Sequence, residues 1–326
     1  MILQPNPENI NLICSQILSG NVVGLPTETV YGLTGNLFDE NAIKKIYSLK
    51  GRPSTNPLIV HINNFNQIFE ITKNINEKQN KYLNILKTFW PGPLTVILPK
   101  KDNVSNLATA GLDSIAIRIP NNNLFLEILE KVGFPLVAPS ANISKQVSPT
   151  TANAVQQEFG ENLSYILNGG QCAVGLESTV ISLTEDIPII LRPGAITLEM
   201  IKEVIPETII KQKIINENDQ QNSPGQQFLH YAPKTPLYFI DDYKIDASKK
   251  TGLIAFQELS LEEKIKYQKV IEISKDKNLS EIAKNLYSAL REMDNSNLDI
   301  ILIDKCEEKG LGLAVMDRLK RASYEK

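Results

Sequence analysis

The sequence predicts an α/β protein of two domains. Short apolar runs typical of strands alternate with amphipathic helical segments along most of the 326 residues. One polar stretch without periodicity, 216–225 (NENDQQNSPG), interrupts this alternation and has the composition of a linker. A chain of this length suits two domains and buries about three quarters of its unfolded surface. We therefore predict domains at 1–207 and 236–326, joined by a linker at 208–235.

The elements of the first domain follow in order from hydrophobic spacing and from glycine and proline breakers. Apolar residues three and four positions apart predict helices. These helices are expected at 9–19, 41–48, 77–89, 123–132 and 151–159. Short apolar runs predict strands at 22–25, 58–62, 94–98, 114–119, 135–138, 165–167, 178–182 and 189–192.

A second alternating set follows the linker. Strands are predicted at 237–240, 252–256, 270–273 and 300–303, and helices at 279–293 and 311–322. This order is typical of a small Rossmann-like module. The module has no GxGxxG motif, so nothing in it indicates dinucleotide binding.

Composition excludes several classes of protein. The net charge of −3 argues against a protein that binds nucleic acid over its whole surface, although a local basic patch stays possible. Cys14, Cys172 and Cys306 form no CxxC pair, which fits a reducing compartment and gives no zinc or redox signature. The N-terminus shows neither a signal peptide nor a long apolar run. We expect a cytoplasmic protein without membrane association.

The segment from Leu25 to His61 is rich in residues without an obvious packing role. It contains PTETVYGL and KGRPSTNPLIVHI, in which Lys50 and Arg52 flank a glycine on a loop stiffened by prolines. Two cations on such a loop form a potential anion site. It is not a Walker A loop, because GxxxxGK[ST] is absent from the sequence. The alternatives are a solvated charged turn for this loop and helix capping for Thr27 or Thr29.

Arg118 is unusual because it lies in an otherwise apolar strand, IAIRIP. A guanidinium there needs an anionic partner, which is either a structural carboxylate or a bound ligand.

Further polar groups follow other predicted strands. Ser140 and Asn142 come directly after one strand, Ser148 precedes a helix, and Arg192 ends another strand. Hydroxyl and amide groups can donate to phosphate oxygens, and helix starts can bind anions, although Ser148 can also belong to a simple cap. Together with the other three cations, Arg192 suggests a pocket for a multiply charged anion such as a nucleoside triphosphate.

No covalent or metal-dependent scheme stands out in the sequence. It has no GxSxG or HExxH motif, only two histidines, and no carboxylate cluster with metal spacing. We therefore expect the chemistry to depend on positioning and charge neutralisation rather than on a covalent intermediate.

Seven motifs, taken together and in order, resemble a YrdC-type domain. They are PTETVYGL, KGRPSTNPLIVHI, WPGPLTVIL, IAIRIP, VAPSANISKQVSPTTA, GLESTVIS and LRPGAI. The segment SPGQQFLHYAPKTP and the second domain resemble the two-domain form of the family, the threonylcarbamoyl-AMP synthases. The resemblance covers nearly the whole chain.

The resemblance implies a fold and a reaction. The fold would be a twisted mixed sheet with a concave cationic cavity. The reaction would convert ATP, L-threonine and bicarbonate to L-threonylcarbamoyladenylate and pyrophosphate, with Mg²⁺ carried by the ATP. A threonylcarbamoyl transferase complex would then modify tRNA next to the anticodon.

The resemblance also implies roles for individual residues. Lys50 and Arg52 would be the catalytic cations. The threonine-binding set would be Thr29, His61, Arg118 and Ser178, with Arg118 taking the carboxylate. The ATP-binding set would be Lys50, Arg52, Asn56, Ser114, Ser140, Asn142, Ser148, Arg192 and Tyr231. No protein metal ligand is implied.

The linker departs from the family pattern. The family usually reads SPGMKYRHYAP, whereas Gln226, Gln227, Phe228 and Leu229 follow SPG here. The charge that this segment contributes to phosphate binding is therefore altered.

Two other functions compete with the synthase on the sequence alone. A cationic concave face would also attract RNA phosphates, as in a ribosome-associated module without catalysis. A related carbamoyl-adenylate enzyme could act on a different acceptor. The net charge and the buried position expected for Arg118 favour a small-molecule pocket.

Overall fold

The protein is described by a computed structural model that covers residues 1–211 and 231–323. The predicted linker at 216–225, the altered residues Gln226 to Leu229, and His230 lie outside the described residues.

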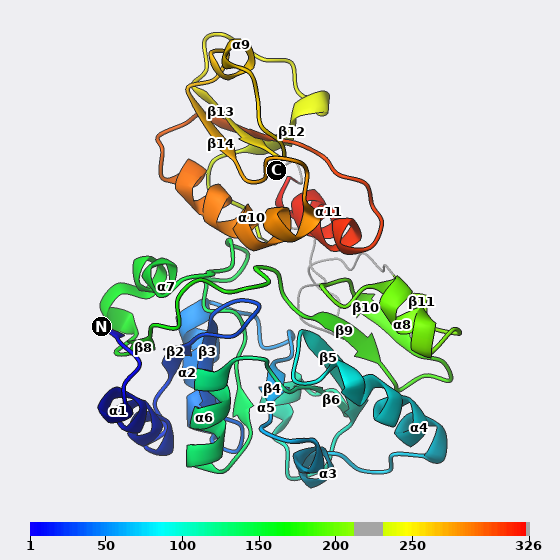
Figure 1. Cartoon of the computed structure of the whole chain (residues 1–326). Coiled ribbons are helices and arrows are strands. Elements are labelled where there is room, and N and C mark those ends of the chain that lie inside the picture. Colours follow the sequence, from blue (N-terminus) through cyan, green and yellow to red (C-terminus); the bar gives the residue numbers. More distant parts are fainter. Residues whose placement is uncertain (212–230, 324–326) are drawn as a thin grey trace.

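The first domain is built on an 11-stranded sheet (Figure 1). Its strands are β1 (Ile2–Leu3), β2 (Val23–Leu25), β3 (Gly32–Asn36), β4 (Ile59–His61), β5 (Leu94–Pro99), β6 (Ser114–Arg118), β7 (Leu136–Val137), β8 (Ile166–Leu167), β9 (Thr179–Ser182), β10 (Ile189–Arg192) and β11 (Ile209–Ile210). Their spatial order is β1-β8-β2-β3-β7-β4-β6-β5-β9-β10-β11. The sheet is mixed, since β4 and β6 run parallel whereas β5 and β6 run antiparallel. The predicted α/β class is confirmed.

Helices flank this sheet and bury its apolar residues. They are α1 (Pro7–Leu18), α2 (Glu40–Lys50), α3 (Ile68–Ile71), α4 (Glu77–Leu86), α5 (Asn106–Thr109), α6 (Asn123–Val132), α7 (Ala152–Phe159) and α8 (Leu198–Val204), with 3₁₀ turns at Phe65–Gln67, Lys87–Phe89 and Gly160–Asn162. The largest apolar cluster gathers residues of α2, α4 and the central strands. A second cluster packs α1 and α6 against the β2 side of the sheet.

The end of α2 determines how the cationic loop leaves the helix. Asp39 caps the N-terminus by accepting a hydrogen bond from the Asn41 backbone N–H, and Lys50 is the last helical residue. Gly51 follows with φ of 56°, in the left-handed region that favours glycine. The chain therefore turns between Lys50 and Arg52, and the two cations point to different surroundings.

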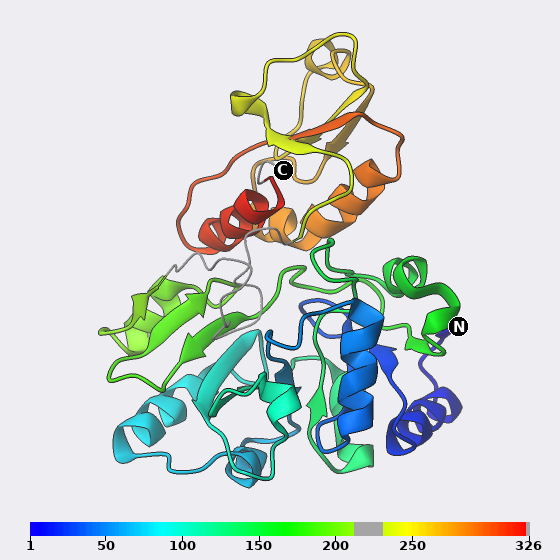
Figure 2. The same ribbon diagram turned by 180° about the vertical axis from the view of Figure 1, so that it is seen from behind.

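The second domain is a four-stranded parallel sheet with helices. Its strands β12 (Leu237–Phe239), β13 (Thr251–Ala255), β14 (Lys269–Glu272) and β15 (Ile300–Ile303) take the order β12-β15-β13-β14. The helices are α9 (Leu261–Lys264), α10 (Leu279–Asp294) and α11 (Leu311–Ala322), and a 3₁₀ turn spans Ile240–Asp242. Figures 1 and 2 show α10 and α11 between the small sheet and the first domain.

The two domains share one apolar cluster. Val30, Val147 and Leu176 of the first domain belong to the same buried cluster as the inner faces of α10 and α11. Gly175, with φ of 80°, lies so close to α10 that an added Cβ would be 2.5 Å from the Lys284 Cα. The contact surface is therefore closely packed.

Six helices and strands of the first domain were not predicted from the sequence: β1, β3, α3, α5, α8 and β11. β3 has the sequence GLTGN, which lacks the apolar pattern of a strand, yet it pairs with both β2 and β7. β11 pairs with β10, so the first sheet extends into the segment expected to be linker. Within residues 1–211 and 231–323, no helix is long and apolar enough to cross a bilayer.

Candidate active site

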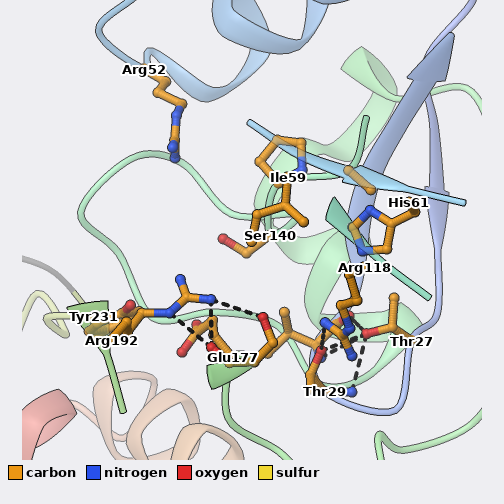
Figure 3. Close-up of a pocket in the computed structure, with 15 residues that line it drawn as sticks. Thr27, Thr29, Arg52, Ile59, His61, Arg118, Ser140, Glu177, Arg192 and Tyr231 are labelled. Carbon is orange, nitrogen blue, oxygen red and sulfur yellow. Dashed lines mark hydrogen bonds between the residues drawn. The ribbon is translucent and has the colours of Figure 1, made fainter. Parts of the chain in front are cut away.

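A cavity that is open to solvent lies in the first domain, close to the second. Strand ends and loops far apart in sequence form its walls (Figure 3). The lining residues are Thr27, Thr29, Val30, Gly32, Arg52, Ile59, His61, Arg118, Ala138, Pro139, Ser140, Glu177, Ser178, Arg192 and Tyr231. Three arginines thus face one cavity, together with one glutamate.

Parallel pairing of β4 and β6 places His61 opposite Arg118. Arg118 is buried, and its Nη1 donates a hydrogen bond to Thr29 Oγ1 at 2.9 Å. Its Nε donates to the Gly92 carbonyl oxygen at 3.2 Å. Thr29 in turn shares a hydroxyl hydrogen bond of 2.8 Å with Thr27. These contacts fix the guanidinium at the wall of the cavity.

Arg118 also forms a buried ion pair that the sequence left as an alternative. Its Nη2 lies 2.7 Å from Glu28 Oε1, and both side chains are less than a tenth exposed. The angle does not fit an N–H···O hydrogen bond, so the contact is an ion pair only. The Glu28 carboxylate neutralises Arg118 but leaves part of the guanidinium available for hydrogen bonding.

Several buried polar atoms next to this wall have no hydrogen-bond partner among the described residues. They are Arg118 Nη2, His61 Nδ1, and both carboxylate oxygens of Glu28. Buried donors and acceptors are nearly always paired in folded proteins, and exceptions mark sites that a ligand or water completes. The cluster therefore offers a cationic donor and carboxylate acceptors to a bound molecule.

His61 is neutral near physiological pH because burial, and then the charge of Arg118, lower its pKa well below 6.5. The unfolded chain protonates this residue below pH 6.5 while the folded chain does not, so the unfolded state binds more protons there. We expect the free energy of unfolding to fall by up to about 1.4 kcal/mol per pH unit below pH 6.5 from His61 alone. Urea unfolding of wild type and His61→Asn between pH 4.5 and 7.5 measures the contribution of His61 to the pH dependence of the free energy of unfolding. Equal pH slopes in the two proteins would contradict it.

Ser178 and Arg192 form a second wall, where β9 and β10 pair antiparallel. Arg192 Nη2 donates to the Ser178 carbonyl oxygen at 2.9 Å and to its hydroxyl at 3.2 Å. The Ser178 hydroxyl also lies 2.7 Å from Thr95 Oγ1. Burial lowers the pKa of Arg192 from 12.5. At Gly194, two residues on, an added Cβ would lie 2.4 Å from the Thr179 nitrogen, so the chain here passes very close to β9.

Arg52 forms a third corner of the cavity (Figure 3). Its Nε donates to the Asn56 carbonyl oxygen at 3.1 Å and its Nη2 to the Pro57 carbonyl oxygen at 2.8 Å. The Asn56 side-chain oxygen also accepts from Arg52. Burial lowers the pKa of Arg52 to about 10, so it stays cationic at neutral pH. Asn56 does not line the cavity, but its oxygens accept hydrogen bonds from Arg52 and so help to fix the Arg52 guanidinium there.

Lys50 is fully buried and is not among the residues that line the cavity. Its Nζ donates to the carbonyl oxygens of Ser140 at 2.5 Å and Asn142 at 2.6 Å. Burial, and then the charge of Arg52, lower the pKa of Lys50 well below 10.5. Lys50 therefore holds the loop that carries Ser140, whose own side chain lines the cavity.

The structure brings most of the predicted site residues together. Those that line the cavity are Thr29, Arg52, His61, Arg118, Ser140, Ser178, Arg192 and Tyr231. Four other predicted residues do not line the cavity but contact residues next to it: Lys50, Asn56, Asn142 and Ser148. The Asn142 side chain donates to the Ile143 and Gln146 carbonyl oxygens. The Ser148 hydroxyl donates to Glu177 at 2.6 Å. Ser114 begins β6, about 13 Å along the strand from Arg118, and is not among the lining residues.

Tyr231 closes the cavity on the side of the second domain. It is 1% exposed, has φ of 66°, and its ring stacks on that of Tyr287 at 5.8 Å. The adjacent Ala232 is held by a backbone hydrogen bond of 3.0 Å to the Lys145 carbonyl oxygen. The structure thus places this predicted residue at the cavity.

Sequence reasoning missed two carboxylates of the site. Glu28 pairs with Arg118, and Glu177 lines the cavity. The available signal was their position inside the motifs PTETVYGL and GLESTVIS, where a charged residue lies among apolar or small neighbours.

Comparison with known proteins gives the family. A family model described as "Telomere recombination", which is named for Sua5, YciO and YrdC proteins, matches residues 15–194, more than half of the chain. The chain belongs to the Sua5/YciO/YrdC family. A second model, described as "Threonylcarbamoyl-AMP synthase, C-terminal domain", matches residues 196–323, so this member of the Sua5/YciO/YrdC family has the two-domain form.

Similar members of the family span almost the whole chain. The threonylcarbamoyl-AMP synthase of Pyrococcus abyssi is 41% identical over 96% of this chain and 94% of its own length. That of Bacillus subtilis is 38% identical over 98% and 94%. The crystal structure of P. abyssi Sua5 complexed with L-threonine superposes with a TM-score of 0.90, at 39% identity over 99% of this chain and 97% of the other. Escherichia coli YciO, at 21% identity, 60% coverage of this chain and a TM-score of 0.53, shares the fold of the first domain.

Proposed function

We propose that this protein is an enzyme, a threonylcarbamoyl-AMP synthase. It converts ATP, L-threonine and bicarbonate to L-threonylcarbamoyladenylate and pyrophosphate. Relatives with this name at 38% and 41% identity cover nearly the whole chain, and the similar P. abyssi structure holds L-threonine. The product supplies a transferase complex that modifies tRNA in the cytoplasm, a compartment that suits the free thiols of Cys14, Cys172 and Cys306.

The cluster around Arg118 of buried polar atoms without a hydrogen-bond partner carries this proposal. Arg118 Nη2 is a donor suited to the carboxylate of an amino acid, and Glu28 and His61 Nδ1 are acceptors suited to its amine or hydroxyl hydrogens. Thr29 and Ser178 complete this end with hydroxyl groups. A small zwitterion fits these atoms better than RNA does, because Arg118 and His61 are buried.

The ATP end of the cavity would lie between Arg52, Ser140, Arg192 and Tyr231. Arg52 and Arg192 supply charge for phosphate oxygens, and the Ser140 hydroxyl supplies a donor. Tyr231 offers an aromatic face at the same end. Lys50, Asn56, Asn142 and Ser148 support these groups from behind.

The reaction needs positioning and charge neutralisation from these residues. The amine of threonine and bicarbonate combine to a carbamate and water. A carbamate oxygen then attacks the α-phosphorus, so that a new P–O bond forms as the bond to the β-phosphate oxygen breaks and pyrophosphate leaves. Arginines on two walls hold the nucleophile and the phosphates in one cavity and stabilise the charge that builds on the phosphate oxygens.

Magnesium would enter on the triphosphate of ATP, since hard cations of this kind prefer phosphate oxygens. The two carboxylates at this site, Glu28 and Glu177, are both already held in ion pairs with arginines. In the part of the chain that the structure describes, no group of three or more His, Cys, Asp or Glu side chains could hold a metal ion.

Pyrophosphate release tests the proposed function directly. We expect release from ATP to require both L-threonine and bicarbonate, and mass spectrometry to detect threonylcarbamoyl-adenylate. Release that ignores threonine would contradict the proposal. Tight RNA binding without turnover would favour the nucleic-acid-binding alternative.

A further inference from the structure

Arg318 of the second domain is the largest fully buried side chain in the described part of the protein. It lies on α11, a helix that Figures 1 and 2 show next to the first domain, and its guanidinium bonds to Glu177 and Pro193 of that domain. A buried guanidinium is costly unless its charge is paired and its N–H groups are bonded. The partners of Arg318 therefore indicate what the residue does.

Three of those partners belong to the cavity wall or adjoin it. Arg318 Nε donates to Glu177 Oε2 at 3.0 Å, and Nη2 donates to the Pro193 carbonyl oxygen at 3.0 Å. The guanidinium also lies over the ring of Tyr231, 5.3 Å from its centre, in a cation–π contact. Glu177 and Tyr231 line the cavity, and Pro193 directly follows the lining residue Arg192.

Glu177 connects this contact to further groups of both domains. One of its oxygens accepts from Ser148 at 2.6 Å, and the other accepts from Tyr287 of α10 at 2.9 Å. Burial alone would raise the pKa of Glu177, but Arg318 and Arg192 outweigh this effect and hold the pKa below 4.5. Glu177 is therefore ionised at neutral pH and bonded on both oxygens.

The fourth partner of Arg318 lies on its own helix. Nη1 donates to Asp317 Oδ2 at 2.7 Å, and Asp317 also pairs with Arg321 at 3.0 Å. Asp317 therefore keeps one cationic partner when Arg318 is replaced, whereas Glu177 loses its direct one.

On the basis of the proposed function, we propose that Arg318 is a positioning residue for the ATP end of the cavity. From the second domain it fixes Glu177, Pro193 and Tyr231 at once, and so sets where Arg192 and Tyr231 stand relative to the nucleotide. The threonine end, around Arg118, is held by contacts within the first domain and does not depend on Arg318.

Steady-state kinetics of Arg318→Met test this role. The change keeps an unbranched side chain but removes the forked donor. We expect kcat/KM for ATP to fall by about tenfold to a hundredfold, since small misplacements of positioning groups have effects of this size. Calorimetry should show unchanged affinity for L-threonine. Arg318→Lys should give a partial loss, because a single ammonium cannot match the planar fork that serves Glu177 and Pro193 together.

A double variant separates positioning from stability. Arg318→Met leaves Glu177 without its ion-pair partner and should lower the melting temperature. Adding Glu177→Gln removes that unpaired charge, so the melting temperature should recover while the ATP defect stays. Recovery of ATP kinetics together with stability would overturn the positioning role, as would equal losses for ATP and threonine.

Arg291→Gln is the matched control for general loosening of the domain contact. Arg291 also crosses between the domains, pairing with Glu158 at 3.0 Å, but it does not line the cavity. We expect its kinetics for ATP to match wild type, and an equal ATP defect in this variant would overturn the proposal. If the wild type shows no threonine-dependent release of pyrophosphate, the proposed function itself fails. Calorimetry with a non-hydrolysable ATP analogue on wild type and Arg318→Met then still decides whether Arg318 positions the nucleotide end.

Discussion

Replacing Arg118 by alanine is expected to lower kcat/KM for L-threonine by about 100-fold or more, with a much smaller change for ATP. The variant loses the donor for the amino-acid carboxylate, and truncating one partner of a buried charge pair costs about 2–5 kcal/mol. It also leaves Glu28 buried without its partner, so we expect the free energy of unfolding to fall by about 3–5 kcal/mol. Kinetics at saturating ATP and urea unfolding measure the two effects.

A substrate analogue separates carboxylate recognition from loss of stability. L-threoninamide keeps the amine and hydroxyl but has no carboxylate. The wild type should bind L-threonine far better than the amide in calorimetry, and Arg118→Ala should bind the two with similar, weak affinity. A variant that still prefers the carboxylate, or one with equal losses for ATP and threonine, would show that Arg118 serves stability alone.

Replacing Lys50 by methionine is expected to disrupt the ATP end of the cavity although Lys50 does not line it. The methionine fills similar space but leaves the carbonyl oxygens of Ser140 and Asn142 buried without their donor, at about 1–3 kcal/mol each. The Ser140 loop then shifts, and we expect kcat/KM for ATP to fall by about 100-fold, since misplacement by 1 Å has effects of this size. Threonine affinity, measured by calorimetry, should change little.

The control for Lys50 lies on the same helix. Lys45 is exposed, and its Nζ donates to the Gly20 carbonyl oxygen at 2.9 Å, away from the cavity. Lys45→Met should therefore match wild type in ATP kinetics and in thermal unfolding. A Lys50→Met protein with normal ATP kinetics would contradict the supporting role that the structure gives to Lys50.

Most of the fold could be predicted from the sequence because most helices and strands have a strong local hydrophobic pattern. Helix α6 begins and ends where the spacing of its apolar residues predicts, with Asn122 as cap and Gly133 after the last turn. β3 is the opposite case, since its two glycines and its asparagine have low strand propensity. Its strand geometry comes from two neighbours in the sheet, which no local pattern encodes.

The same limit applies to the candidate site. Motifs identified the arginines of the cavity, because charged residues at strand ends and in apolar strands are unusual. They did not show that Lys50 bonds carbonyl oxygens behind the cavity, because the direction of a side chain depends on tertiary contacts. Arg318 could not be recognised from the sequence, because α11 contains several charged residues and its sequence pattern does not show which of them is buried.

The apolar cluster common to both domains is expected to couple the unfolding of one domain to that of the other. Val30, Val147 and Leu176 pack against α10 and α11, so separating the domains would expose apolar side chains on both. We therefore expect thermal unfolding to be a single transition, and a fragment that ends before β12 to expose an apolar face beside its own candidate active site. A mutation in this shared core is therefore expected to lower activity in two ways. It reduces the fraction of folded protein, and it displaces residues of the active site.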